Sequence, residues 1–382
     1  MSESTLPTTS RQLVFTERDA MAVSDSPVPP TGDDDVLLRV ALVGICATDL
    51  HLLAGHIGDP FPLVPGHEFV GEVAAIGPAA ARSRGLAVGD HVAVEMLLPC
   101  RSCARCREGR YNLCEADDMA LGLERGRQYG VNIPRTVEPG LWGGYSEYLH
   151  VPAEATTHRL PDAMPWERAV LVEPLAVAYR TIQRARLSPG ESVVIIGPGP
   201  VGLLAAAAAR AAGAGRVIVA GTRDSRLELA RRFGADAVVN TRETDAVAAV
   251  RAELGGLADV VIEIAGVAAA QQQAVQLARR GGRVVLAGAC GANVAVTFRA
   301  DEELLTREID LLPSFLSAGG FEPAIALLGR NEFPFTELVT HRFALEQTAE
   351  AFATIAAREA GVIKAVLEPG LRRPAPLDGR AA

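Results

Sequence analysis

The stretch from Ser192 to Ala212 constrains the fold of this chain more than any other. Residues 192–196 (Ser-Val-Val-Ile-Ile) form a short, continuous apolar run, the pattern of a strand buried in a parallel sheet. A glycine turn, Gly-Pro-Gly-Pro-Val-Gly, follows at residues 197–202 and leads into an alanine-rich helical stretch. A glycine triplet alone is a weak signal, but here it follows a strand and opens a helix. This context indicates a dinucleotide-binding turn.

The chain after the glycine turn continues to alternate between apolar strands and helical stretches. Five further apolar runs lie at residues 216–220, 237–240, 260–264, 283–286 and 309–312. Together with the first run they complete a doubly wound parallel sheet, whose glycine turn lets a pyrophosphate approach the helix N-terminus. The alternative is a glycine-rich turn that binds no ligand. We therefore predict an α/β protein with a Rossmann dinucleotide-binding domain at residues 175–318.

The first third of the chain follows a different pattern. Apolar and polar residues alternate over residues 11–43, with prolines and glycines between the runs, which is typical of short antiparallel strands. We predict a β-rich, barrel-like domain over residues 1–174. The chain ends on an apolar run, Val362 to Leu367. Because the parallel sheet is already complete, we expect residues 319–382 to return to the first domain.

Length and charge limit the classes of function. A chain of 382 residues exceeds one ordinary core, so two domains are the default. The net charge of −9 and the lack of a long basic run argue against nucleic acid or an anionic membrane as the main partner. The N-terminus has neither the basic start nor the apolar stretch of a secretory signal, and no apolar run is long enough to span a bilayer. We therefore expect a cytoplasmic protein.

Four of the six cysteines form one compact group: Cys100, Cys103, Cys106 and Cys114. Disulfides and free thiols are the alternatives to metal binding. Spacings of two residues make disulfides awkward, and four exposed thiols would be open to oxidation. Four thiolates this close can close a tetrahedral shell around one zinc ion. We predict a structural zinc lobe at about residues 96–118, which organises the chain but performs no chemistry.

A second group of metal-binding side chains lies between residues 44 and 68. Cys46, His67 and Glu68 offer one sulfur, one imidazole nitrogen and one carboxylate oxygen, the ligand mix of a catalytic zinc site with an open position. A lone cysteine is more often a small core residue, and a lone histidine is more often structural. Three further polar residues stand close to Cys46: Thr48, Asp49 and His51.

These motifs occur together, in one order, along nearly the whole chain. The order is Cys46-x-Thr48-Asp49-x-His51, Gly66-His67-Glu68, the four-cysteine loop, Glu173-Pro174-Leu175 and the glycine turn. From about residue 12 to residue 368 the chain thus resembles the zinc-containing medium-chain dehydrogenases, the family of alcohol, sorbitol and threonine dehydrogenases. The resemblance implies a GroES-like catalytic domain beside the Rossmann domain. It also implies alcohol–carbonyl interconversion by hydride transfer to nicotinamide, two zinc ions per chain, and homodimers or homotetramers.

The resemblance also assigns roles to residues of the predicted catalytic site. Cys46, His67 and Glu68 look like the ligands of the catalytic zinc. Glu173 stands where polyol- and threonine-type members have a glutamate and ethanol-type members a cysteine. We interpret it as a fourth protein ligand or as a hydrogen-bond partner of the zinc-bound water.

Three residues near Cys46 are expected to support the reaction: two relay the proton of the alcohol, and one orients a zinc ligand. The pKa of a threonine hydroxyl is far too high for a base, so Thr48 can only relay a proton. His51 is the next station toward solvent, with the cofactor ribose between them; an ordinary surface histidine is the alternative. Asp49 is expected to orient a zinc ligand.

The end of the second Rossmann strand carries the signal for cofactor choice. NAD enzymes usually place an acid there to bind the ribose 2′-hydroxyl. Counted from Gly197, that position is Gly221, followed by Thr222 and Arg223, which leaves room for a 2′-phosphate and supplies donors to it. We predict that NADP is preferred over NAD, with Asp224 as the counter-argument. The other residues expected at the cofactor are Gly199, Pro200, Val201, Gly202, Arg226, Gly266 and Gly288.

The sequence therefore predicts a zinc-dependent dehydrogenase that reversibly oxidises a secondary alcohol or polyol to a ketone. A carbonyl or iminium reductase on the same scaffold is one alternative; Thr48 and His51 favour alcohol chemistry. A nucleotide-binding structural protein without activity is another, and it predicts broken ligand sets. Leu52, Leu53 and Trp142, with the loop at residues 115–140, would form an apolar pocket suited to a cyclic or larger alcohol.

Overall fold

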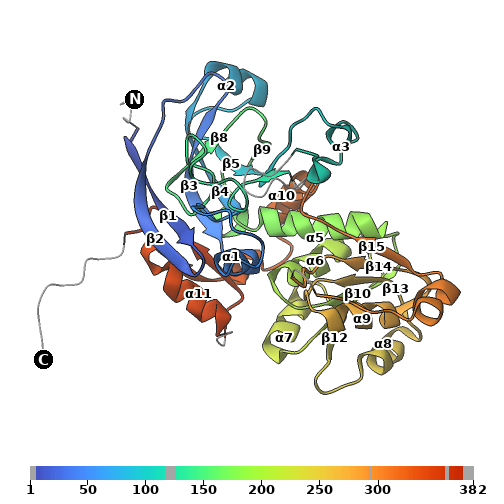
Figure 1. Ribbon diagram of the computed structural model, residues 1–382. Helices are drawn as coiled ribbons and strands as arrows, with labels where there is room; N and C mark the ends of the chain where they lie inside the picture. Colours follow the sequence, from blue (N-terminus) through green and yellow to red (C-terminus); the bar gives the residue numbers. More distant parts are fainter. Residues whose placement is uncertain (1–5, 117–125, 292–293, 358–360, 373–382) are drawn as a thin grey trace, which may run out of the picture. The chain divides into compact units, whose positions relative to one another are not determined.

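The computed structural model describes residues 6–116, 126–291, 294–357 and 361–372 (Figure 1). The chain divides into two compact units. The first unit is made of Met1–Leu98, Ala116–Asp162 and Thr340–Ala382, and the second of Pro99–Glu115 and Ala163–Val339.

The first unit is built around short strands that pair mainly antiparallel. Strands β1 (Thr9–Glu17) and β2 (Ala20–Pro27) form an antiparallel hairpin. A seven-stranded sheet follows the order β16-β17-β3-β4-β5-β9, with β8 also pairing with β3. Its strands are β3 (Val36–Gly44), β4 (Glu68–Ile76), β5 (His91–Val94), β8 (Tyr148–Val151), β9 (Thr157–Arg159), β16 (Val339–Phe343) and β17 (Lys364–Leu367). The remaining elements are β6 (Leu97–Leu98), β7 (Arg127–Gln128), α1 (Ala47–Leu53), α2 (Pro78–Arg84), η5 (Leu345–Gln347) and α11 (Thr348–Ala356). The predicted β-rich first domain is confirmed.

The second unit contains the doubly wound sheet that the sequence predicts. Its six strands are all parallel, in the order β12-β11-β10-β13-β14-β15. They are β10 (Ser192–Ile196), β11 (Arg216–Gly221), β12 (Ala237–Asn240), β13 (Ala258–Glu263), β14 (Ala278–Leu286) and β15 (Asp310–Pro313). Every one of them overlaps a run predicted from the sequence.

Helices cover both faces of this parallel sheet, with α5 and α6 on one face and α8 and α9 on the other (Figure 1). The helices are α3 (Ala104–Arg107), α4 (Trp166–Ala169), α5 (Val172–Ala185), α6 (Pro200–Ala211), α7 (Asp224–Arg232), α8 (Ala246–Leu254), α9 (Ala268–Leu277) and α10 (Phe321–Arg330). Short helical turns complete the unit: η1 (Tyr111–Leu113), η2 (Ala300–Leu304), η3 (Leu305–Arg307) and η4 (Phe335–Leu338).

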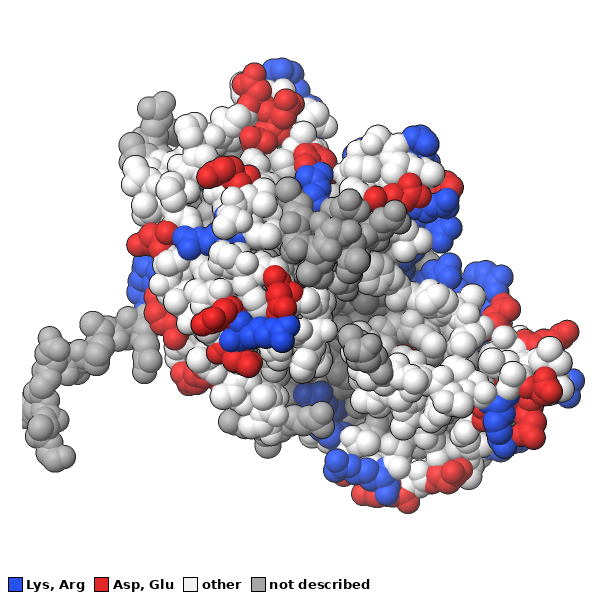
Figure 2. Space-filling view, in the orientation of Figure 1, with Lys and Arg blue, Asp and Glu red and all other residues white. Residues whose placement is uncertain are grey.

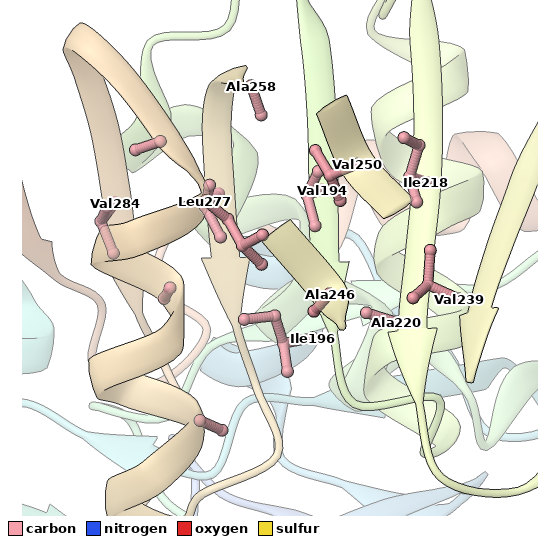
Figure 3. Packing of buried hydrophobic residues seen from close by; sticks show 14 of the residues in the cluster. Val194, Ile196, Ile218, Ala220, Val239, Ala246, Val250, Ala258, Leu277 and Val284 are labelled. Atoms are coloured by element: carbon pink, nitrogen blue, oxygen red, sulfur yellow. The ribbon is translucent and has the colours of Figure 1, made fainter. Parts of the chain in front are cut away.

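The core of the second unit explains why its strands lack polar positions. Alternate side chains of β10 and β11 pack against α8 and α9 on one face of the sheet (Figure 3). Each fully buried Val or Ile contributes about 1.5–3 kcal/mol relative to an exposed one. The labelled members of this cluster include Val194, Ile196, Ile218, Val250 and Leu277.

Two boundaries differ from those expected. The cysteine loop groups with the second unit because it is hydrogen-bonded there: Asn112 Nδ2 donates to the Phe315 carbonyl at 3.0 Å, and the Gly319 N–H donates to the Tyr111 hydroxyl at 2.9 Å. Helix α10 also stays with the second unit, packed on α5. The return to the first unit begins at Thr340, and β17 then pairs with β3, as the apolar run at the end of the chain predicts.

The charges on the surface and the lengths of the helices can be compared with the sequence analysis. Acidic and basic side chains alternate across the face in Figure 2 and form many short ion pairs, such as Arg39 with Glu72. Within the described ranges, no helix has the length and apolar character needed to cross a bilayer.

Candidate active site

The ends of two neighbouring strands bring Cys46, His67 and Glu68 together. Strand β3 ends at Gly44, and β4 begins at Glu68; in the antiparallel register these two residues are partners. Cys46 lies two residues beyond β3, and His67 immediately precedes β4. One ligand atom from each of the three side chains lies within 4.8 Å of the others. The structure thus assembles the predicted three-ligand group.

Glycines make this arrangement possible. Gly66 has a φ of +93°, and a Cβ there would overlap the ring of Tyr145. A Cβ at Gly44 would collide with the Glu68 carboxylate and the Lys364 side chain. The chain can therefore fold the His67–Glu68 corner against its neighbours only with glycine at these two positions.

Asp49 lies behind the ligand group and is fully buried. Its Oδ2 accepts hydrogen bonds from the Cys46 N–H at 2.8 Å and from the Tyr145 hydroxyl at 2.9 Å. Its Oδ1 lies 3.5 Å from Nδ1 of His67. This places Asp49 where it can orient the imidazole and leave Nε2 for a metal.

The same contacts shift the pKa values of His67 and Tyr145. Burial alone lowers the pKa of His67, but the adjacent Asp49 carboxylate more than offsets this, and the pKa is raised well above its ordinary value. Burial, reinforced by Asp49, raises the pKa of Tyr145 far above its usual range. Tyr145 therefore acts as a neutral hydrogen-bond donor. The sequence reasoning missed it, because the Gly-Gly-Tyr-Ser-Glu-Tyr run indicates only a strand.

Lys364 is the second residue that sequence reasoning missed. It is the only lysine in the chain; the other 36 of the 37 basic residues are arginines. Its side chain is 4% exposed, and its ammonium pairs with the Glu68 carboxylate, which is 3% exposed. Nζ also donates to the Ile45 carbonyl at 3.0 Å. A buried cation thus touches one of the three predicted metal ligands.

The two predicted relay residues lie on helix α1. Thr48 Oγ1 lies 3.6 Å from the Cys46 sulfur. His51 lies in the last turn and is exposed, and its Nδ1 is 3.2 Å from Nδ1 of His56. Since a hydrogen bond between these nitrogens needs one donor and one acceptor, only one of the two carries the shared proton. His56 is not among the residues that the sequence analysis predicts for this site.

The expected apolar pocket is not formed by two of its predicted members. Leu52 is fully buried in the first unit. Trp142 is 7% exposed, its Nε1 donates to the Val137 carbonyl at 2.8 Å, and its ring packs edge-on against His150. Both are core residues, because their apolar bodies are covered by the unit itself. Residues 117–125 of the loop predicted to complete the pocket lie outside the described residues.

The four-cysteine loop has the geometry of a closed metal site. Its four sulfur atoms lie within 4.8 Å of one another, with 4.0 Å between Cys100 and Cys106. Zinc–sulfur bonds of about 2.3 Å at tetrahedral angles place sulfur atoms roughly 3.8 Å apart. All of these cysteines are free of disulfides. The loop therefore fits one zinc ion.

Backbone amides prepare these sulfurs for a cation. The N–H groups of Cys103 and Cys106 donate to the sulfurs of Cys100 and Cys103, at 3.3 and 3.4 Å. Hydrogen bonds from the backbone and hydroxyl of Ser102 lower the pKa of Cys100 to about 6, whereas burial raises the pKa of Cys106 to about 12. A bound cation would therefore favour the thiolate at Cys106 in particular.

The glycine turn of the second unit leaves the start of helix α6 open. A Cβ at Gly202 would overlap the Gly197 carbonyl, whereas the space beside Gly199 is empty within 4 Å. Gly199 is the N-cap residue and offers no side-chain cap to α6, which begins at Pro200. The N–H groups of Val201 and Gly202 thus have no intrahelical partner, as a pyrophosphate site requires.

Two further residues predicted to contact the cofactor, Gly266 and Gly288, meet where β13 and β14 end. A Cβ at Gly288 would contact the Gly266 nitrogen, so the two loops touch. Glu263 lies beneath them, fully buried, and accepts a hydrogen bond from the Gly266 N–H at 2.8 Å. Burial raises the pKa of this carboxyl. Gln271 completes the contact by donating to the Gly288 carbonyl at 3.1 Å.

The end of β11 contains the residues predicted to select the cofactor. Gly221 is the last residue of β11, Arg223 precedes α7, and Arg226 lies in its first turn. The Asp224 carboxylate accepts a hydrogen bond from Asn240 Nδ2 at 2.7 Å. Asp224, the residue that favours NAD, is therefore held by a hydrogen bond at the end of β12.

Glu173 occupies the first turn of α5 in the second unit and is buried there. The cluster of Cys46, His67 and Glu68 belongs to the first unit. The role of Glu173 as a fourth ligand stays a prediction.

Comparison with known proteins agrees with this geometry. Residues 32–162 match the alcohol dehydrogenase GroES-like domain, and residues 200–330 match the zinc-binding dehydrogenase domain. The chain is 40% identical, over 94% of its length and 98% of the relative's, to a Mycobacterium tuberculosis protein named probable alcohol dehydrogenase. The chain belongs to the zinc-type medium-chain dehydrogenase/reductase family.

Other members of this family show similar coverage. The sorbitol dehydrogenase of Bacillus subtilis is 35% identical over 91% of this chain and 94% of its own. Among solved structures, a zinc-binding dehydrogenase of Sinorhizobium meliloti 1021 bound to NADP is 29% identical, with a TM-score of 0.83 over 95% of this chain and all of its own. An alcohol dehydrogenase of Escherichia coli complexed with NADH is 27% identical, with a TM-score of 0.82 over the same shares.

Proposed function

We propose that this chain is a zinc- and NADP-dependent dehydrogenase that reversibly oxidises a secondary alcohol or polyol to the ketone. The observation that carries the proposal is the intact group of Cys46, His67 and Glu68, with Thr48 beside Cys46. A chain that had kept the fold and lost the chemistry would be free to lose these side chains.

The residues present fit both metal ions that the family implies. Cys46, His67 and Glu68 would hold the catalytic ion, with Glu173 as the proposed fourth partner, and the four-cysteine loop would hold the structural ion. When bound, the catalytic ion supplies Lewis acidity toward an alcohol oxygen, and the nicotinamide supplies a hydride acceptor.

The chain's own residues position the ligands and move the proton. Asp49 and Tyr145 hold His67 and the Cys46 backbone in place. The Thr48 hydroxyl accepts the alcohol proton while passing its own onward. His51, which is exposed and hydrogen-bonded to His56, delivers the proton to solvent.

Three features support NADP over NAD. Gly221 presents no acid to the ribose, and Arg223 and Arg226 lie at the end of the same strand. The Asp224 carboxylate accepts a hydrogen bond from Asn240. The S. meliloti structure binds NADP, whereas the E. coli one binds NADH. Steady-state rates should give a higher kcat/KM with NADP; equal values, or a preference for NAD, would contradict the proposal.

The polyol class rests on Glu173 and on the relative that is named a sorbitol dehydrogenase. We further propose a cytoplasmic homodimer or homotetramer. Absorbance at 340 nm with polyols, secondary alcohols and cyclic alcohols would separate the substrate classes. Light scattering after size exclusion would give the subunit number.

A further inference from the structure

Gly221 is a glycine because of its neighbour rather than its backbone. Its φ lies outside the left-handed region, so any residue could adopt its conformation. A Cβ there would nevertheless overlap Cδ and Cγ of Pro198, closer than a real Cβ approaches any atom. The next nearest atom, Cδ2 of Leu227, is 3.6 Å away, which is ordinary contact. Pro198 is thus the one obstacle among the nearest atoms.

The proline ring cannot turn away from Gly221. Ring closure fixes the φ of Pro198, so its Cδ moves only with the backbone. That backbone is held on one side, because the Gly197 N–H donates to the Ala220 carbonyl at 2.9 Å. The backbone of residue 221 is held as well, since its carbonyl accepts from the Thr241 N–H at 2.8 Å.

We propose that Pro198 is a specificity-determining residue for the cofactor. Its ring keeps position 221 free of any side chain, and so excludes the acid that would bind a ribose 2′-hydroxyl and repel a 2′-phosphate. Cofactor choice is thereby set jointly by the glycine turn after β10 and by the end of β11. The effect of Pro198 on cofactor choice rests on the proposed preference for NADP. The steric exclusion of a side chain at position 221 by the Pro198 ring does not.

A double-mutant cycle of melting temperatures, the stability cycle, tests the steric exclusion at position 221 without any cofactor. The four proteins are the wild type, Gly221→Ala, Pro198→Ala and the double variant, compared by their melting temperatures. Gly221→Ala should lower Tm by about 2–10 °C in the wild-type background, because overpacking of this kind shifts the Tm of a domain of about 150–250 residues by that amount. In the Pro198→Ala background the same change should cost less than about 2 °C. Equal losses in both backgrounds would overturn the proposal.

A binding cycle tests the specificity. Dissociation constants for NADP⁺ and NAD⁺ are measured by calorimetry for the wild type, Pro198→Ala, Gly221→Asp and the double variant. The single Gly221→Asp change should weaken binding of both cofactors. The double variant should shift the ratio of the two affinities toward NAD by at least about tenfold relative to Pro198→Ala, because a hydrogen bond to a charged group strengthens binding by about that factor or more. A stable Gly221→Asp protein that prefers NAD on its own would overturn the proposal.

The two cycles separate this proposal from the proposed function. A wild type that binds NAD more tightly than NADP would refute the cofactor preference, and the cofactor role of Pro198 with it. Coupling between positions 198 and 221 in the stability cycle would still establish the steric exclusion. If Gly221→Asp does not fold, a soluble double variant would support the steric exclusion of a side chain at position 221. An insoluble double variant would contradict it.

Discussion

Replacing Lys364 by methionine removes the only ammonium from the buried side of the predicted metal site. The side chains of Lys364 and Glu68 are 4% and 3% exposed, so the change leaves a carboxylate buried without its counter-charge. Breaking a buried pair from one side costs about 3–5 kcal/mol. We expect this loss in the metal-free protein and a smaller loss with zinc bound, because a cation then compensates Glu68.

The assay is urea unfolding of the first unit, followed by the fluorescence of Trp142 in a Trp166→Phe background. Trp142 is buried in the first unit, whereas Trp166 belongs to the second. Arg39→Met is the matched control, because Arg39 on β3 pairs with Glu72 on β4 in the same sheet but is exposed. It should cost no more than about 1 kcal/mol.

The size of the zinc effect decides the outcome. The difference in stability between zinc-loaded and metal-free protein should be larger in Lys364→Met than in the wild type. A metal-free Lys364→Met protein as stable as the Arg39→Met control would refute the reasoning. Lys364→Arg, which keeps the charge, should recover part of the loss.

Three further changes probe other parts of the account. Asp49→Asn should weaken catalytic zinc binding about 10–100-fold and leave about one zinc per chain by elemental analysis, since Asp49 orients His67; two retained zincs would contradict this. Cys106→Ser should release the structural zinc and lower Tm, while unchanged zinc content would argue against the closed site. Because burial raises the pKa of Glu263 above its ordinary 4.5, its contribution to stability is complete below about pH 4.5 and is lost as pH rises through the raised value. The Tm of Glu263→Gln should therefore rise relative to the Tm of the wild type as the pH is raised from 4 to 7. A Tm difference between the two proteins that does not change with pH would contradict this reasoning.

The parallel sheet could be predicted because its strands are local signals. A strand such as Ser192–Ile196 is apolar at nearly every position, and the glycine turn after it has a fixed spacing. The group of Cys46, His67 and Glu68, predicted as metal ligands, could be found in the sequence for a similar reason. They flank two strands that pair directly, so a short stretch of sequence contains the whole group.

Lys364 and Tyr145, which contact Glu68 and Asp49, could not be predicted because they lie far along the chain from the residues that they contact. Lys364 reaches Glu68 only through the pairing of β17 with β3, and Tyr145 reaches Asp49 across 96 residues. The sequence predicts that Trp142 lines an apolar pocket with Leu52, Leu53 and the loop at residues 115–140. The hydrogen bond to Val137 and the packing on His150 make it a core residue instead.

The most direct test of the central claim is the absorbance change at 340 nm when the zinc-loaded protein is mixed with NADP⁺ and a panel of polyols and secondary alcohols. Zinc content is measured on the same sample. With about two zincs per chain, we predict NADPH formation with at least one alcohol class, and loss of that turnover in Cys46→Ser. Fully loaded protein that reduces neither NADP⁺ nor NAD⁺ with any alcohol, and oxidises neither reduced cofactor with the matching ketones, would contradict the account.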